Sequence, residues 1–195
     1  MATLAVCLVV KNGRKTVLSC LDSIATVADE VVVVDTGSVD GTVELARAWG
    51  ARNRKLMVVD AVGSRFHDSD GNFDCGAAKN HAIGLAKSDY VMWIDANETV
   101  EQPPRLRKAF EVITARSPDA SIYIHLLNMP SYFFPRLRIC KRQNARFEGR
   151  IHELLTSHSF ESKWAATVST RAGSPTRITR SASCSGFRWR WKQEP

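Results

Sequence analysis

Four short apolar runs, alternating with helical patterns, constrain the fold of this chain more than any other feature. The runs cover residues 4–10, 31–34, 56–59 and 90–94. Each has the length of one strand, and continuous apolar sequence is typical of strands that are buried on both faces. Helical segments lie between them, and strands that alternate with helices form parallel sheets. We therefore expect an α/β fold with a mainly parallel, doubly wound sheet.

Local signals set the expected ends of these helices. The first helix covers about 17–24, where apolar residues recur at helical spacing. The second follows the turn-rich segment 36–42, and Gly50 is its expected stop, because glycine tolerates the left-handed conformation that closes many helices. The third covers about 75–87, and Asp74 is placed to cap its exposed backbone amides.

The character of the sequence changes in its last fifth. Before that point, a helix over 106–115 and shorter strands over 121–127, 136–140 and 146–148 are expected. Beyond Leu155, serines, tryptophans and basic residues follow without helical or alternating period. We expect a folded domain at 1–155 and a basic tail at 156–195 that is disordered or derived from a frameshift or truncation. The alternative is a functional tail that docks on anionic lipid or polymer.

The positive charge of the chain is concentrated in this tail. The net charge is +7, and residues 156–195 contain seven lysines and arginines against two glutamates. The predicted domain is therefore nearly neutral, and it lacks interleaved basic and aromatic residues. Both features argue against nucleic acid as a partner.

Cysteine spacing and the apolar start of the chain indicate the compartment. The five cysteines are Cys7, Cys20, Cys75, Cys140 and Cys184, without any Cys-x-x-Cys pair. Such spacing argues against a disulfide framework or a zinc site, and small buried hydrophobic residues are the simpler interpretation. The apolar start, 1–10, is too short for a membrane span and is interpreted as a core strand. We expect a cytoplasmic protein, with peripheral contact at the inner face of the membrane as an alternative.

Polar side chains lie at the expected carboxyl ends of the strands, the edge at which open α/β sheets bind ligands. They are Lys11, Asn12, Asp35, Lys79, Asn80, Asp95, Asn97 and Glu98. Asp95 and Asn97 are two residues apart, so in an extended segment both side chains face the same side. Two oxygens at that spacing suit one hard cation, which in turn holds a diphosphate. The pattern indicates a nucleotide-diphosphate site.

Structural alternatives exist for each of these residues. Asp35 has the alternative role of closing a turn, and 95–98 that of an exposed strand end. Lys79 and Asn80 are alternatively part of an exposed helix face. Two other nucleotide sites are excluded, because 36–42 lacks the glycine spacing of a dinucleotide fingerprint and no P-loop sequence occurs.

Taken in order, these segments resemble the family 2 glycosyltransferases of GT-A fold. The matching pieces are Val-Lys-Asn after the first strand, Val-Val-Val-Val-Asp-Thr-Gly-Ser-Val-Asp-Gly-Thr at 31–42, Ala-Ala-Lys-Asn at 77–80 and Trp-Ile-Asp-Ala-Asn-Glu at 93–98. Arg-Phe-Glu-Gly-Arg-Ile-His-Glu at 146–153 is similar to the R-F-x-G-x-I-H-E segment of one bacterial-type branch. The resemblance covers about residues 3–155 and implies a GT-A nucleotide-diphospho-sugar transferase fold.

The resemblance implies nucleotide contacts for five residues. In the family, the aspartate at the position of Asp35 binds the base of a UDP-sugar. Lys11 and Asn12 match residues beside the nucleotide. Lys79 and Asn80 match a pair that approaches the base or the diphosphate.

The resemblance also implies a metal site and an acceptor site. Asp95 and Asn97 match the positions that hold the ribose and a divalent metal, Mn²⁺ or Mg²⁺. The family normally has aspartate at the second position, whereas Asn97 offers an oxygen without charge, and we expect Glu98 or the diphosphate to compensate. His152 and Glu153 match acceptor-site groups, with Glu153 as the candidate general base. An ion pair with a nearby arginine is the alternative role of this glutamate.

The implied activity is inverting transfer of a sugar from a UDP-sugar to a hydroxyl of a glycan, a lipid-linked glycan or a peptide. A carboxylate would remove the proton of that hydroxyl, and the metal would stabilise charge on the departing diphosphate. A catalytically impaired relic that still binds nucleotide sugars is the alternative, indicated by Asn97 and by the altered C-terminal sequence.

Overall fold

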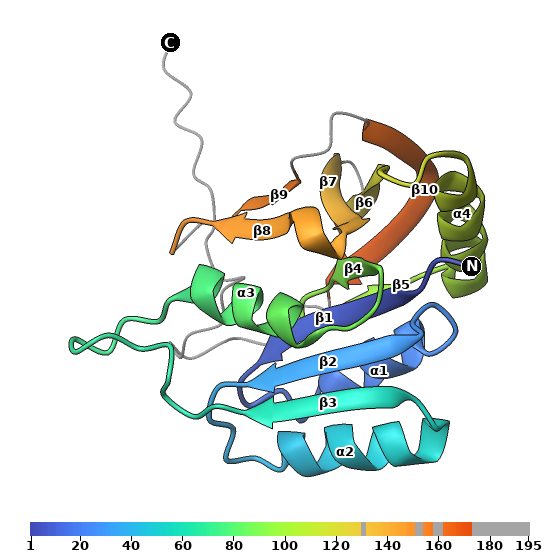
Figure 1. Cartoon of the computed structure of the whole chain (residues 1–195). Helices are drawn as coiled ribbons and strands as arrows, with labels where there is room; N and C mark the ends of the chain where they lie inside the picture. The colour runs from blue at the N-terminus through green and yellow to red at the C-terminus, as the bar shows by residue number, and fades with distance from the viewer. Residues whose placement is uncertain (130–131, 151–153, 158–161, 173–195) are drawn as a thin grey trace.

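The computed structural model of the chain describes residues 1–129, 132–150, 154–157 and 162–172. In chain order the elements are β1 (Leu4–Val10), α1 (Val17–Ile24), β2 (Glu30–Asp35), α2 (Thr42–Asn53), β3 (Leu56–Ala61), α3 (Cys75–Leu85), β4 (Tyr90–Trp93), β5 (Glu98–Val100), α4 (Pro103–Arg116), β6 (Ser121–Met129), β7 (Tyr132–Lys141), a 3-10 turn (Arg142–Asn144), β8 (Ala145–Glu148), β9 (Leu154–Ser157) and β10 (Ser162–Ala172). Figure 1 shows these elements around one large sheet.

The large sheet has eight strands in the order β3-β2-β1-β4-β7-β6-β10-β5, and β8 pairs with β9 in a second sheet. The first four strands in this order are all parallel, while β7 runs antiparallel to both β4 and β6. The expected α/β class and the parallel arrangement of the first half are therefore confirmed. The strands of the second half are mixed in direction. Neighbouring strands that are joined by a short connection can run antiparallel.

Side chains of β1 alternate between the two faces of the sheet and join two apolar cores. Leu4, Val6 and Leu8 pack with buried residues of α1, α2 and α4. Ala5 and Cys7 pack on the opposite face with α3 and β8. Because both faces are covered, β1 is apolar at every position, which explains its continuous apolar sequence.

Two predicted helix ends are wrong. The structure continues α2 through Gly50 to Asn53, and Arg54 adopts the left-handed conformation with φ of +50°. The glycine is required for packing instead, because a Cβ at Gly50 would lie 2.5 Å from the sulfur of Met57. The other helix, α3, ends at Leu85 rather than at residue 87.

A strand that the sequence did not predict lies beyond the expected domain boundary at residue 155. The segment 162–172 forms β10, which pairs parallel with β6 and antiparallel with β5. This strand lies within the segment 156–195 that was expected to form a tail, and the division of the chain at residue 155 stays a prediction. Backbone pairing between segments far apart in the chain leaves no local periodicity by which to recognise it. Residues 173–195 lie outside the described part.

Three of the cysteines fit the sequence interpretation and one does not. Cys7, Cys20 and Cys140 are buried and free, and burial raises the pKa of each thiol, that of Cys140 to about 12. Cys75, at the start of α3, is disulfide-bonded, so its interpretation as an unpaired hydrophobic residue is wrong. Cys184 lies outside the described residues.

Of the helices described, none is both long enough and apolar enough to span a membrane.

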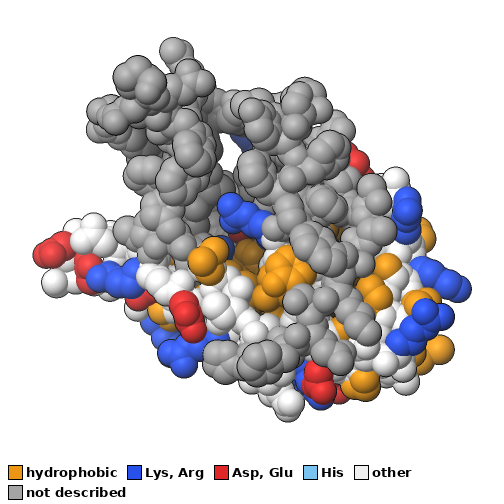
Figure 2. Space-filling view, turned by 90° about the horizontal axis from the view of Figure 1, so that it is seen from above, with side chains coloured by type: hydrophobic (Ala, Val, Ile, Leu, Met, Phe, Trp, Pro, Cys, Tyr) orange, Lys and Arg blue, Asp and Glu red, His pale blue; other side chains and the backbone are white. Residues whose placement is uncertain are grey.

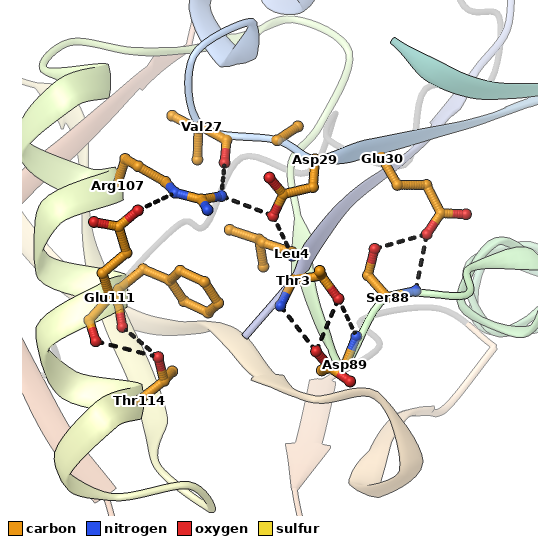
Figure 3. Close-up of polar contacts among 12 residues, drawn as sticks. Thr3, Leu4, Val27, Asp29, Glu30, Ser88, Asp89, Arg107, Glu111 and Thr114 are labelled. Carbon is orange, nitrogen blue, oxygen red and sulfur yellow. Dashed lines mark hydrogen bonds and ion pairs between the residues drawn. The ribbon is translucent and has the colours of Figure 1, made fainter. Parts of the chain in front are cut away.

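A buried carboxylate joins the amino ends of β2 and β4. Glu30 is 1% exposed, and its Oε2 accepts hydrogen bonds from the backbone amides of Lys87 and Ser88 at 2.9 Å and from the Ser88 hydroxyl at 2.8 Å. Figure 3 shows this contact beside a second network, in which Arg107 donates to Asp29. These bonds capture the amides that follow α3, which explains why the helix ends early.

Replacing this carboxylate should destabilise the fold. Glu30→Ala leaves two backbone amides and a hydroxyl buried without an acceptor, so we expect a loss of roughly 2–4 kcal/mol in the free energy of unfolding. Urea denaturation followed by circular dichroism measures it. Asp70→Ala, on an exposed loop, is the matched control, and an equal effect in both variants would contradict this account.

Candidate functional site

Three parallel strands deliver polar residues to one edge of the sheet. In the pairing of β1 with β2, Val10 lies opposite Asp35, and in that of β1 with β4, Cys7 lies opposite Trp93. Figure 1 shows the arrowheads of β1, β2 and β3 on the same side as the start of α3. Strands β2 and β3 lie on one side of β1, and β4 lies on its other side. Such a change of direction creates the crevice in which α/β sheets bind ligands.

Asp35 carries an unused acceptor at this edge. Its carboxylate is 2% exposed, and Oδ1 accepts hydrogen bonds from the amides of Gly37 at 3.0 Å and Ser38 at 2.8 Å. The other oxygen, Oδ2, is buried and has no hydrogen-bond partner within the described part of the chain. Buried carboxylate oxygens are rarely left without a donor, so Oδ2 is suited to receive one from a ligand.

Asn12 holds the loop after β1 against the turn after β2. Its backbone amide donates to Ser38 Oγ at 2.7 Å, and its side-chain oxygen accepts from the Val39 amide at 2.9 Å. Its backbone is left-handed, with φ of +52°. The predicted nucleotide residue therefore has a structural function at the site edge, and Lys11 beside it is exposed.

Asp95 and Lys79 form the charged centre of the site. Asp95 Oδ1 accepts a hydrogen bond from the Trp93 indole at 3.0 Å and lies 3.7 Å from the Lys79 ammonium. The ammonium lies 4.6 Å from the ring centre of Trp93 and 4.9 Å from that of Phe147. Burial would raise the pKa of Asp95, but the positive charges of Lys79 and Arg138 lower it. Asp95 is therefore held as a carboxylate.

Asn80 connects α3 to β8 rather than pointing to open solvent. Its amide nitrogen donates to the carbonyl of Phe147 at 2.9 Å, and its oxygen accepts from the amide of the same residue at 2.8 Å. This pair of bonds fixes the Phe147 ring beside Lys79. The structure thus gives Asn80 a positioning role, distinct from the nucleotide contact that the sequence predicted.

Glu98 is turned away from the site and into the protein. Its carboxylate is 4% exposed; Oε1 pairs with Arg138 Nη2 at 2.8 Å, and Oε2 accepts from the Asp95 amide at 3.0 Å. Arg138, also buried, donates to the Trp93 carbonyl at 3.2 Å. Burial raises the pKa of Glu98, and the nearby Asp95 charge adds to that effect. This pair braces the turn that carries Asp95, a role that sequence spacing could not reveal.

The described residues at this edge supply few ligands for a divalent metal. Among the described residues, no three His, Cys, Asp or Glu side chains converge to hold an ion. Asp95 already has one oxygen engaged, Asn97 is half-exposed and uncharged, and Glu98 is sequestered by Arg138. The assignment of Glu98 as a compensating metal ligand therefore has no support in this geometry.

The segment before the predicted acceptor residues is docked on α3. The Cys75 amide donates to the Arg150 carbonyl at 3.1 Å, and a Cβ at Gly76 would lie 2.1 Å from the Gly149 carbonyl oxygen. The Arg150 side chain pairs with Asp68 at 2.9 Å and with Asp74 at 3.5 Å. Residues 151–153, which include His152 and Glu153, lie outside the described part.

The loop 62–74 that Arg150 contacts projects from the sheet edge. Figure 2 shows acidic and basic side chains next to one another at this projecting end of the molecule. Asp74 caps α3, as predicted, by accepting from the Ala77 amide at 2.8 Å. The loop, the helix start and the 149–150 segment are thereby held together.

Comparison with known proteins identifies what this architecture is similar to. The profile described as Glycosyl transferase family 2 matches residues 5–173. An uncharacterized glycosyltransferase of Rickettsia prowazekii is 27% identical over 156 residues, which cover 75% of this chain and 48% of that protein. A TPR repeat-containing protein of Synechococcus elongatus is 34% identical over 98 residues, covering 50% and 21%. The chain spans about half or less of the length of these curated relatives.

Solved structures show the same fold. Mannosyltransferase PcManGT from Pyrobaculum calidifontis, in complex with GDP-Man and Mn²⁺, has a TM-score of 0.66 and 20% identity, covering 90% of this chain and 58% of that one. S. aureus TarS 1–349 in complex with UDP-GlcNAc has a TM-score of 0.65 and 14% identity, covering 96% and 62%. The expected GT-A fold is therefore confirmed.

The Arg150 contact can be tested through the pKa of its partner. The Arg150 guanidinium, followed by the Asn72 amide, lowers the pKa of Asp68 from 3.8 to about 2. Because the folded value is lowered, the contact stabilises the protein above pH 3.8 and is lost as the pH falls through about 2. We expect Arg150→Ala to raise this pKa in a carboxyl-carbon NMR titration. The same rise in the control Arg146→Ala would refute the assignment.

The buried pair behind Asp95 should be costly to break. Arg138→Met leaves the Glu98 carboxylate buried without its cation, so we expect a loss of roughly 3–5 kcal/mol in unfolding free energy. The double variant Arg138→Met/Glu98→Leu removes both charges and should restore much of the lost unfolding free energy. The surface pair of Lys141 with Asp119 is the control, and Lys141→Met should cost less than about 1 kcal/mol. Equal losses in both single variants would contradict this ranking.

Proposed function

Since this chain belongs to glycosyltransferase family 2, we propose that it is an inverting glycosyltransferase that uses a UDP-sugar donor. The acceptor is a hydroxyl group of a glycan, a lipid-linked glycan or a peptide. The observation that carries the proposal is the buried Oδ2 of Asp35, which has no hydrogen-bond partner among the described residues, at the shared carboxyl edge of β1, β2 and β4. The GT-A fold supports the same class of ligand.

The geometry at Asp35 favours uracil over guanine as the base. Oδ1 is already occupied by the amides of Gly37 and Ser38, so one oxygen is left to accept a hydrogen bond. Uracil offers one ring N–H on its pairing edge, whereas guanine offers a ring N–H and an amino group. The unoccupied oxygen suits the single ring N–H of uracil, whereas the two neighbouring donors of guanine would have to share one oxygen in poorer geometry, which costs binding energy.

The chemical step is a single in-line displacement. The acceptor oxygen attacks the anomeric carbon and forms the new glycosidic bond as the bond to the β-phosphate oxygen breaks, which inverts the configuration. The proton of the acceptor hydroxyl passes to a carboxylate, and UDP departs with the bonding electrons. We assign the carboxylate to Glu153 and an acceptor-binding role to His152, on the family resemblance of 146–153.

Metal use in the family does not transfer directly to these residues. The Pyrobaculum relative was solved with Mn²⁺, and a divalent ion bound with the donor would stabilise charge on the leaving diphosphate. Among the described residues, Asp95 is the carboxylate next to Lys79 and Trp93, and these three side chains would orient the diphosphate end of the donor.

A catalytically impaired relic that binds nucleotide sugars is the second candidate, favoured by the neutral Asn97. The two are separated by incubating the full chain with a panel of UDP-sugars and acceptors and measuring UDP release. An active transferase releases UDP with an acceptor present. A relic binds UDP but shows no release above the rate without protein.

The base contact gives the sharpest binding test. Asp35→Asn can keep the Oδ1 bonds but replaces Oδ2 by a donor, so we expect UDP affinity in calorimetry to fall roughly 10- to 100-fold. Asp119→Asn, a 60% exposed aspartate side chain at the opposite edge, should leave it unchanged. Tighter binding of GDP than of UDP by the unmodified chain would disprove the uracil assignment.

A further inference from the structure

We propose that a hollow between α2 and β3 is a docking surface for a membrane that contains anionic lipid. The hollow follows the outer edge of the sheet, because β3 is the first strand in the sheet order and no described strand pairs with its outer side. Figure 1 shows α2 running along this strand. The volume of the hollow is about 360 Å³. Its lining is Arg47, Gly50, Ala51, Arg54, Lys55, Met57 and Val59.

Positive charge gathers around this hollow. Arg47, Arg54 and Lys55 line it, and among the described residues no acidic side chain does. The Lys55 ammonium donates a hydrogen bond to the carbonyl of Ala28 at 2.8 Å, which holds the cation in place without neutralising it. A surface with this charge attracts anionic lipid head groups.

Stabilisation of the helix explains only part of this charge. Cations at the carboxyl end of a helix interact favourably with its dipole, and the effect falls off within the last turn. Arg54 and Lys55 directly follow the last residue of α2 and fit this role. Arg47 lies about two turns earlier, beyond the reach of that effect, and is exposed to solvent. Its position beside the hollow is explained by an anionic partner.

Apolar surface accompanies the cations. Leu56, the first residue of β3, is 59% exposed and directly follows Lys55. Met57 and Val59 are half-buried and give the hollow an apolar floor. At a membrane interface, cations contact lipid phosphates while an adjacent leucine enters the acyl boundary. A soluble acidic peptide would pair with the charges but would leave Leu56 in water, so the membrane is the partner that fits both features.

Co-sedimentation of the full chain with lipid vesicles tests the proposal. We expect binding to vesicles of equal parts phosphatidylcholine and phosphatidylglycerol to exceed binding to pure phosphatidylcholine roughly tenfold or more at low salt. Arg47→Gln/Arg54→Gln should weaken binding to the mixed vesicles roughly tenfold, and Leu56→Ser should weaken it about threefold. The midpoint of thermal unfolding shows that each variant is folded. UDP affinity should be unchanged in both variants, because these residues lie outside the nucleotide site.

Matched variants elsewhere in the chain separate this surface from general charge attraction. Arg105→Gln/Lys108→Gln makes the same change of charge at two exposed residues of α4, and Val112→Ser matches the leucine variant at a 41% exposed valine. Both should leave vesicle binding within about twofold of the unmodified chain.

Three outcomes would overturn the proposal. The first is an equal loss of vesicle binding in the α4 variants. The second is a larger loss in Arg188→Gln/Arg190→Gln than in the α2 variant, which would assign membrane binding to the basic segment after residue 172. The third is binding of soluble poly-glutamate as tight as that of the mixed vesicles and unaffected by Leu56→Ser, which would indicate an acidic protein partner.

Discussion

The central constraint on this molecule is the position of β1 between β2 and β4, parallel to both. Every residue of this strand is apolar because helices and β8 cover its two faces. Because β1, β2 and β4 run in the same direction, their carboxyl ends lie at one edge of the sheet. Asp35 and Asp95 lie at the same edge of the sheet for this reason, although they are 60 positions apart in the sequence.

The site then depends on two carboxylates with different surroundings. Glu98 is buried with Arg138 and supports the turn, whereas the side chain of Asp95, three residues earlier, stays 30% exposed beside Lys79. Burial raises the pKa of the first, while neighbouring cations lower the pKa of the second. A short segment of sequence therefore contains one acid in a buried ion pair and one acid at the exposed edge of the sheet, and only the direction of each side chain distinguishes them.

Sequence reasoning recovered the elements that have local signatures. The first four strands, the helices between them and the Asp74 cap follow from apolar periodicity and capping chemistry. Features that depend on contacts between residues far apart in the sequence were not predicted. Gly50 is needed for the approach of Met57 rather than for a helix stop, and β10 is defined by backbone pairing with distant strands. At the site, the spacing of the sequence grouped Glu98 with Asp95. Only the ion pair with Arg138, on β7, shows that the Glu98 side chain points into the protein.

The most direct measurement is a crystal structure of the chain soaked with UDP. We expect the uracil ring with its N–H on Asp35 Oδ2 and the β-phosphate next to Lys79 and Asp95, at the edge shared by β1, β2 and β4. UDP bound elsewhere on the sheet, or a diphosphate directed away from Lys79, would contradict it.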